Sequence, residues 1–294
     1  MQWDWLFFTE VTLAGLGGGA LYALAGLAFV IVYKATRVVN LAIGEMLMMG
    51  AYLFFAFVAG MSLPVWLAAP LAIVGSGMMG GVIERLAIRP MLGEPPISVF
   101  MVTVGLSSIM VGLVELIWSA QQRRLPEFLP ATPIFIGEAF VSSKVFYSFL
   151  VAVSLVSIVV AVFRFWRGGI ALRATATDQG AAYAMGINVP RVFLLAWVAS
   201  AALAAVAGIA VGAIGGLSST MGIFGLSVLV VVIVGGLDSV VGALVAGLMI
   251  GVVEAWAGAF LGGEYKLLAT FVVLVVVLML RPYGLFGTRD IERL

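Results

Sequence analysis

Long apolar runs recur along almost the whole chain, and this repetition constrains the fold more than any other feature. A run of roughly 20 apolar residues is long enough to cross the hydrocarbon core of a bilayer as a helix. Candidate spans lie at 11–33, 41–60, 63–84, 99–119, 146–165, 191–212, 217–236, 239–259 and 266–281. Hydrophobic residues make up 64% of the 294 residues, well above the share in soluble domains. The sequence predicts an all-α, polytopic membrane protein with about eight to nine transmembrane helices, forming a single transmembrane domain over residues 1–294.

The positive charges predict which connections face the cytoplasm. Eleven of the fifteen Lys and Arg residues lie in alternate connections, at positions 34, 37, 85, 89, 164, 167, 173, 191, 281, 289 and 293. Because cytoplasmic connections are enriched in Lys and Arg, we expect these connections inside and the N-terminus outside. Within 217–259, residues 235–239 are expected to be either a cytoplasmic turn between two full spans, which parity favours, or the tip of a shorter re-entrant hairpin.

Two connections are longer than the others. Residues 120–146 contain three prolines and are expected outside, either as a plain loop or as a cap or docking surface for an external partner. Residues 166–190 are expected inside and are far more polar than their surroundings. Good helix formers over Ala171–Met185, followed by Gly186, predict a helix there. Its many alanines favour a docking element for another protein, and the alternative is an amphipathic helix resting on lipid headgroups.

The chain lacks the residues that several kinds of chemistry require. Cysteine and histidine are absent, which removes thiolate nucleophiles, imidazole bases and the commonest zinc and haem ligands. None of the three lysines follows a P-loop, so we expect no ATP site, metal or cofactor in this chain. The acids well inside predicted spans are Glu45, Glu115 and Glu254, and the last two fall toward outer ends where solvation is expected. No Ser-Lys or carboxylate pair in the sequence indicates a membrane-embedded enzyme. A stand-alone secondary carrier or channel stays an alternative.

Glu45 stands at the start of the run Glu-Met-Leu-Met-Met within a predicted span. Asn40 is predicted to cap a helix that begins at Leu41, which would place Glu45 only about 7 to 8 Å inward. One interpretation is an interfacial carboxylate. The other is a carboxylate that hydrogen-bonds across helices and organises a break or gate, lined by pliable methionines such as Met49. Asn40, Glu45 and Met49 are therefore candidate pathway or gate residues.

A short internal echo offers further candidates. The sequence VGLSSIM at 104–110 recurs as GGLSSTM at 215–221, in spans that would run in opposite directions. Inverted repeats in transporters place the pathway at the repeat interface, whereas a seven-residue echo in apolar sequence also arises by chance. If the repeat is real, the candidate pathway residues include Ser107, Ser108, Ser218 and Ser219.

Four segments, in this order along the chain, carry a family resemblance. They are NLAIGEMLMMGAY at 40–52, RATATDQGAAYAMGINVPRV at 173–192, GGLDSVVGALVAGLMIGVVEA at 235–255 and RPYGLFG at 281–287. Together they resemble the LivH-type permease subunits of branched-chain amino acid ABC importers. The resemblance implies a multi-pass protein of the bacterial cytoplasmic (inner) membrane, surrounded by lipid and without a nucleic-acid partner. It also implies three kinds of protein partner: a second, LivM-like permease, two cytoplasmic ATPases that bind ATP and Mg, and an extracytoplasmic solute-binding protein.

The resemblance also assigns roles to residues. In that family the segment matching 173–188 is similar to a coupling helix that fits a groove on the ATPase. This implies coupling roles for Arg173, Ala174, Asp178, Gly186, Ile187 and Asn188. Family members commonly have N-F-A-H-G-E where this chain has Leu41 and Ile43, so the histidine beside Glu45 is missing. The cargo therefore stays open among branched-chain or other hydrophobic amino acids, urea, amides and aromatic or other organic acids.

Overall fold

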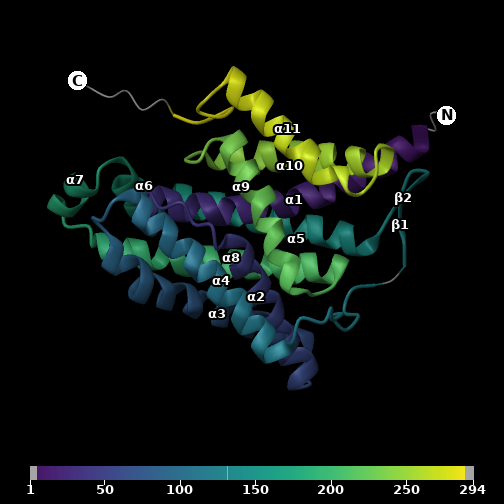
Figure 1. The fold of residues 1–294 in the computed structure, drawn as a ribbon, viewed down its shortest axis with the longest axis horizontal. Coiled ribbons are helices and arrows are strands. Elements are labelled where there is room, and N and C mark those ends of the chain that lie inside the picture. Colours follow the sequence, from purple (N-terminus) through teal and green to yellow (C-terminus); the bar gives the residue numbers. More distant parts are fainter. Residues whose placement is uncertain (1–4, 131, 289–294) are drawn as a thin grey trace. The chain divides into compact units, whose positions relative to one another are not determined.

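Apolar helices make up most of the chain in the computed structural model, which describes residues 5–130 and 132–288 (Figure 1). Within these residues seven helices are long and apolar enough to cross a membrane, and two shorter apolar helices cover Ser219–Gly235 and Tyr265–Leu280. Each predicted span corresponds to one of these helices, and the prediction of an all-α polytopic membrane protein is confirmed. Arg289 and Arg293 of the predicted charge asymmetry lie outside the described residues.

The elements follow one another along the chain with short connections. The long helices and their extensions are α1 (Trp5–Thr36), α2 (Ile43–Phe55) with η1 (Ala56–Gly60), α3 (Val65–Ile83) with η2 (Glu84–Ile88) and η3 (Arg89–Met91), α4 (Pro96–Trp118), α5 (Ser143–Phe165), α8 (Val189–Gly215), α10 (Val240–Phe260) and α11 (Tyr265–Leu280). The shorter elements are β1 (Ile134–Ile136), β2 (Ala139–Val141), α6 (Arg167–Thr177), α7 (Gln179–Ala184), η4 (Ser219–Ile223) and α9 (Phe224–Gly235).

The described residues fall into two compact units. The first unit contains 5–30, 129–130, 132–153 and 226–288, and the second contains 31–128 and 154–225. Helices α1, α5 and α9 each contribute residues to both units. The single transmembrane domain expected over residues 1–294 stays a prediction.

Helix α2 forms the centre of the second unit. Eleven of its 13 residues are buried, so it is covered on all sides rather than along one stripe. It packs on α3, α4 and α8, and α3 packs on α8. A Cβ atom on Gly80 of α3 would lie 2.5 Å from the carbonyl oxygen of Trp197 on α8, so only glycine permits this approach. Such close backbone contacts are typical of membrane helices, because lipid supplies no hydrophobic drive between them.

In the first unit, α1 and α10 meet through small residues. A Cβ atom on Gly19 of α1 would lie 2.8 Å from the carbonyl oxygen of Gly247 on α10, and one on Gly15 would lie 2.8 Å from Val252 Cα. Helix α10 also packs on α11. The glycine clusters of both helices therefore serve close packing.

The connection at 120–146 contains a β-hairpin in addition to irregular chain. Strands β1 and β2 pair antiparallel, with Ile134 opposite Val141. The amide of Phe140 donates a 2.8 Å hydrogen bond to Glu10 Oε1 on α1, which ties this hairpin to the first helix.

The chain after α11 folds back onto the turn between α9 and α10. The amides of Leu285 and Phe286 donate hydrogen bonds to the carbonyl oxygens of Val234 and Gly235, at 2.8 and 3.0 Å. Thr288 Oγ1 donates to Asp238. Residues 281–288 and 234–238 therefore lie at the same end of the first unit.

Helix α9 has 12 residues and rises about 18 Å, less than the hydrocarbon core of about 30 Å.

Candidate functional site

The polar connection at 166–190 contains two helices rather than the one predicted over Ala171–Met185. Helix α6 ends at Thr177, and α7 begins at Gln179. Asp178 between them has an extended backbone (φ −154°, ψ 113°), and its Oδ1 accepts a 2.9 Å hydrogen bond from the amide of Ala181. An aspartate side chain that satisfies a free amide at a helix start is a strong N-cap. It starts a new helix here, which is why the predicted continuous helix is wrong.

The far end of this segment is fixed by two further caps. The amide of Ile187 donates to the carbonyl oxygen of Ala182, and the amide of Gly186 donates to that of Tyr183, each at 3.0 Å. This pair of bonds is a Schellman motif, which requires a left-handed residue, and Gly186 has φ 82°. Asn188 then caps α8, because its Oδ1 accepts from the amide of Arg191 at 3.1 Å. The predicted stop at Gly186 is confirmed.

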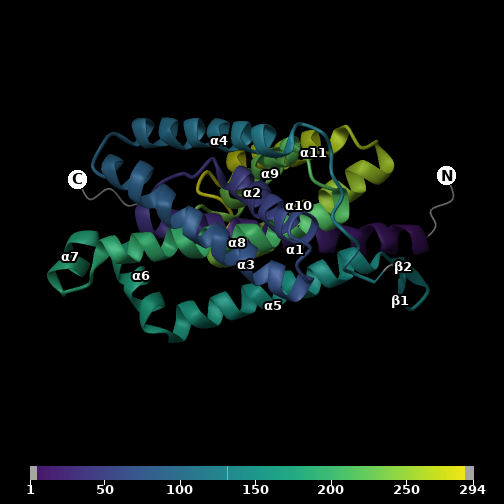
Figure 2. The same cartoon turned by 90° about the horizontal axis from the view of Figure 1, so that it is seen from below.

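The α6–α7 segment lies where α8 begins (Figures 1 and 2), and both of its helices contact α8. Among the predicted coupling residues, Arg173, Asp178, Gly186 and Asn188 are exposed, while Ala174 and Ile187 are half-buried. Two large apolar side chains that are not among the predicted coupling residues are also exposed here. Tyr183 is 72% exposed and Met185 is 83% exposed. Tyrosine and methionine are enriched at protein interfaces, so this surface fits a protein partner.

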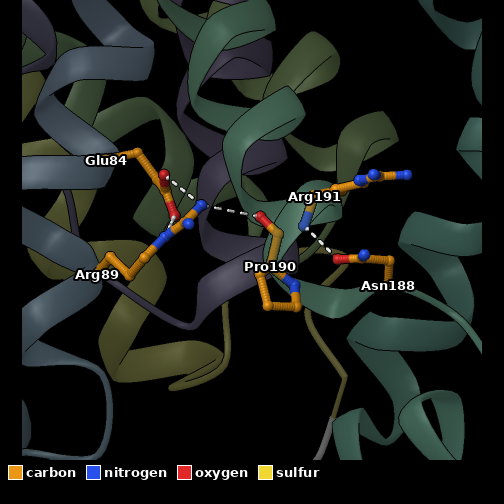
Figure 3. Close-up of polar contacts among 5 residues, drawn as sticks. All are labelled: Glu84, Arg89, Asn188, Pro190 and Arg191. Carbon is orange, nitrogen blue, oxygen red and sulfur yellow. Dashed lines mark hydrogen bonds and ion pairs between the residues drawn. The ribbon is translucent and has the colours of Figure 1, made fainter.

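Arg89, at the end of α3, forms a bidentate ion pair with Glu84 and a hydrogen bond to the start of α8 (Figure 3). Arg89 Nε and Nη2 donate to Glu84 Oε1 and Oε2 at 3.0 and 2.9 Å, and Arg89 Nη2 also donates to the carbonyl oxygen of Pro190 at 3.3 Å. The side chain of Glu84 is fully buried, and that of Arg89 is 36% exposed. A fork-like guanidinium pair of this kind fixes geometry as well as charge. The start of α8 is therefore held against the end of α3.

Regular helix periodicity does not predict this ion pair, for a geometric reason. In an α-helix, residues five apart point about 140° away from each other. Residues Glu84–Ile88 form a π-helical turn, in which the amide of Arg89 bonds to the carbonyl oxygen of Glu84. That turn brings Glu84 and Arg89 to the same side. Arg37 makes a second anchor, because its Nη2 donates to the carbonyl oxygen of Ala176 at 3.2 Å.

The predicted cap at Asn40 is wrong, because α2 begins two residues after Leu41. Its N-cap is Ala42, which makes no side-chain cap bond. Asn40 is fully buried, its Oδ1 accepts from the amide of Ala42 at 3.1 Å, and its Nδ2 donates to Met46 Sδ at 3.3 Å. Asn40 thus forms a local turn that leads into the helix. Glu45 consequently lies within the first turn of α2, where the helix dipole favours an acid.

The Glu45 carboxylate is buried against the break between α8 and α9. A Cβ atom on Gly222 of η4 would lie 2.6 Å from Glu45 Oε1, so the two elements are in direct contact. Ser107 of α4 is a hydrogen-bonding neighbour of this carboxylate. Glu45 Oε2 has no hydrogen-bond partner among the described residues. A buried oxygen in this state is costly, so its place in the fold needs a physical explanation.

The remaining predicted pathway residues surround the same region. Met49 is buried one turn further along α2. Ser107 is half-buried, whereas Ser108 is exposed and bonds within its own helix to the carbonyl oxygen of Val104. Ser218 and Ser219 are half-buried, and Ser218 Oγ shares a 2.8 Å hydrogen bond with Thr220 Oγ1. Both echo segments reach α2, since η4 and α4 each contact α2 and each other.

Glu254 in the first unit is not simply solvated, as was expected. Its carboxylate accepts hydrogen bonds from the hydroxyl groups of Tyr22 at 2.6 Å, Ser227 at 3.2 Å and Thr270 at 2.5 Å. These partners come from α1, α9 and α11, so one acid links four helices. Glu115 is exposed, as expected. Within the described part of the chain, no three acidic side chains gather as a metal site would require.

One protein family matches this chain over most of its length. The model of the family described as "Branched-chain amino acid transport system / permease component" matches residues 11–278. The chain belongs to this family. Its residues 166–190 and the α2–η4 region, described above, both lie within the matched range.

Two relatives agree with this membership, and a solved structure shares the fold. The permease protein LivH of a high-affinity branched-chain amino acid transport system from Salmonella typhimurium is 30% identical, with 100% of each chain covered. The corresponding protein BraD from Pseudomonas aeruginosa is 30% identical over 97% of this chain and 98% of BraD. PsaBC from Streptococcus pneumoniae, solved in complex with a Fab, shares the fold with a TM-score of 0.53 and 11% identity, covering 92% of this chain and 91% of that one. This family member is therefore an ABC transporter permease and a multi-pass inner-membrane protein.

Proposed function

We propose that the chain is one of two permease subunits that form the translocation path of an ABC importer. Its relatives are named for branched-chain amino acid transport, which supports a branched-chain or other hydrophobic amino acid, or a similar small organic solute, as cargo. A second, LivM-like permease completes the path, and an extracytoplasmic solute-binding protein delivers the cargo. Two cytoplasmic ATPases bind ATP and Mg, so this chain needs no cofactor of its own.

The shape and the exposed side chains of the α6–α7 segment are the main support for this proposal. It has a polar character, three caps that define its shape, and two large apolar side chains, Tyr183 and Met185, exposed at its tip. A segment that only rested on lipid would bury its bulky apolar residues along one face of a longer helix. A short capped helix with an exposed tyrosine instead fits a groove on a protein such as the ATPase.

Force on this segment reaches the transmembrane helices through named contacts. Asn188 joins the segment directly to α8, Arg89 joins α8 to α3, and Arg37 joins α6 to the end of α1. ATP-driven closure of the ATPases would push α7 and move α8 and α3 together. The two permease subunits would thereby switch between outward- and inward-open states.

The α2–η4 contact is the gate in this scheme. The unpartnered oxygen of Glu45 lies beside a broken helix, and broken helices line the substrate site in many transporters. Leu41 and Ile43 give the approach to Glu45 an apolar character, which fits a hydrophobic cargo. The other candidate pathway or gate residues in this scheme are Asn40, Met49, Ser107, Ser108, Ser218 and Ser219.

Reconstitution tests the proposal. The chain, its second permease and its ATPases are placed in proteoliposomes with the binding protein, and ATP-dependent uptake of leucine is measured beside ATP hydrolysis. Gly186→Trp should lower uptake at least tenfold while hydrolysis continues. Gly93→Trp is the matched control, because both glycines have positive φ and neither has an atom within 4 Å of an added Cβ.

Two results would contradict the proposal. Gradient-driven uptake by the isolated chain would make it a secondary carrier or channel. Equal uptake by the Gly186→Trp and Gly93→Trp proteins would remove the coupling role of the α6–α7 segment.

A further inference from the structure

A cavity of about 530 Å³ lies in the second unit, beside the coupling segment. Its wall is formed by the end of α5, by α6 and by α8, together with Ile31 of α1. Phe163 and Trp166 line one side, Leu172 lines the second, and Leu195 and Leu203 line the third. This volume lies within the range of about 300–1,000 Å³ that is typical of sites for small ligands.

The cavity has an apolar body and one charged end. Among the described residues that line it, Arg191 is the only charged one, and Asn188 lies beside it near the start of α8. From Arg191 the lining continues along α8 to Leu203, a rise of about 18 Å. That length is close to the depth of one leaflet, which is half of the hydrocarbon core of about 30 Å. The shape thus suits a single extended acyl chain with a polar group at Arg191.

The positive charges on and beside the 166–190 connection favour one kind of polar group. Arg167 and Arg173 are exposed on α6, and Arg164 and Arg191 are exposed at the ends of α5 and α8 on either side of the connection. Asp178 is the one acidic residue in the range 164–191, and its carboxylate already caps α7. An excess of cations at the membrane surface attracts anionic headgroups, and basic pockets between transmembrane helices bind them.

We propose that this cavity binds one anionic phospholipid, with an acyl chain along α8 and the phosphate at Arg191. The lipid belongs to the cytoplasmic leaflet, which rests on the orientation given in the proposed function. Because α6 and the start of α8 form part of the wall, the bound lipid touches the coupling segment directly. The cavity would therefore change shape when that segment moves.

Native mass spectrometry of the purified, delipidated full-length chain tests this. The probes are phosphatidylglycerol and phosphatidylethanolamine with identical acyl chains. The unchanged protein should retain phosphatidylglycerol at least fivefold more than phosphatidylethanolamine. Ala199→Trp should abolish this preference by filling the cavity, since Ala199 lines it. Arg191→Gln should lower it at least fivefold, because the Asn188 cap uses only the backbone amide of Arg191.

Two control variants separate the cavity from general effects. Ala161→Trp adds the same bulk to an exposed site on α5 outside the lining. Arg85→Gln removes an exposed charge expected at the same membrane surface. Both controls should retain phosphatidylglycerol as the unchanged protein does. Ala199→Leu, a smaller change, keeps the test valid if the tryptophan variant does not fold.

Three outcomes would overturn the proposal. They are equal retention of the two lipids by the unchanged chain, full retention of phosphatidylglycerol by the Ala199 variants, and equal losses in the matched controls. The measurement uses the isolated chain without ATPases or cargo. Its failure would therefore leave the proposed transport function standing, and failure of ATP-driven uptake would leave the lipid site standing.

Discussion

At the scale of single residues, Arg89 carries the clearest energetic role. It neutralises the fully buried carboxylate of Glu84 and also bonds to Pro190. Arg89→Ala would leave a buried charge without its partner. Since Arg89 is about one third exposed, the cost should lie between about 0–1 kcal/mol for surface pairs and about 3–5 kcal/mol for buried ones.

Thermal unfolding of the Arg89→Ala protein in detergent measures this loss. Arg85→Ala is the control, because Arg85 is exposed in the same π-helical turn and forms no ion pair with any residue that the structure describes. The double variant Arg89→Ala, Glu84→Gln should recover part of the lost stability. Equal stability of the Arg89→Ala and Arg85→Ala proteins would contradict the anchoring role.

Gly222 gives a second prediction at this scale. A Cβ atom there would lie 2.6 Å from Glu45 Oε1, so Gly222→Ala must displace the carboxylate. Overpacking of this kind costs about 1–3 kcal/mol, and we expect uptake to fall at least tenfold. The shorter side chain of Glu45→Asp should reduce the penalty, which a double-mutant cycle on unfolding would detect.

Gly105→Ala is the control for this cycle, because an added Cβ at Gly105 has no atom within 4 Å. If the Glu45→Asp change left the Gly222→Ala penalty unaltered, the contact between the two residues would not be the cause.

The residues that could be predicted from the sequence are those whose role depends on local chain geometry. Gly186 was identified because a helix needs a left-handed residue to end there. Glu254 was misjudged because its three hydroxyl partners lie between 16 and 232 positions away. Arg89 was missed because only a π-helical turn places it beside Glu84. The Glu254 contacts follow from tertiary packing and the Arg89 pair follows from a local π-helical turn, and regular helix periodicity encodes neither.

At the scale of elements, α7 is the part of the chain most clearly built for contact with another protein. It is six residues long and is held by the Asp178 cap and the Schellman motif rather than by its own length. Its exposed Tyr183 and Met185 are therefore free to contribute to binding. The double variant Tyr183→Ser, Met185→Ser should weaken copurification of the ATPases at least tenfold, without changing the thermal unfolding of the isolated chain.

Tyr265→Ser provides the matched control, since Tyr265 is 45% exposed at the start of α11 in the first unit. It should leave ATPase binding unchanged. Loss of binding in this control, or full binding by the double variant, would argue against α7 as the docking element.

The positions of elements were more predictable than their ends. Hydrophobic runs located every long helix, because burying backbone polar groups in lipid demands a helix wherever the chain is apolar. The start of α2 was misplaced by two residues, since Asn40 forms a turn instead of a cap. The division of 171–185 at Asp178 was missed because helix propensity favours a continuous helix and does not register the cap.

At the scale of the whole molecule, the contacts at the α9–α10 turn constrain how the chain crosses the membrane. Residues 285–286 bond to the backbone of 234–235, so the turn and the C-terminal segment lie at the same end of the first unit. Positive charge predicts that Arg281 is cytoplasmic. The turn should then be cytoplasmic too, as expected for one crossing by η4 with α9 (Ser219–Gly235) and another by α10, rather than for a hairpin tip inside the bilayer.

Cysteine labelling measures this directly, because the chain contains no cysteine. Leu237→Cys and Met185→Cys should react with a membrane-impermeant maleimide only in inside-out vesicles, where the cytoplasmic face is exposed. Glu138→Cys, in the hairpin turn between β1 and β2, should react only in right-side-out cells. The polar turn at 237 should react as fast as position 185, because two crossings leave it in water. A cysteine at 237 that reacts from neither side, while positions 185 and 138 label as expected, would place the turn in the bilayer and make 217–259 a re-entrant hairpin.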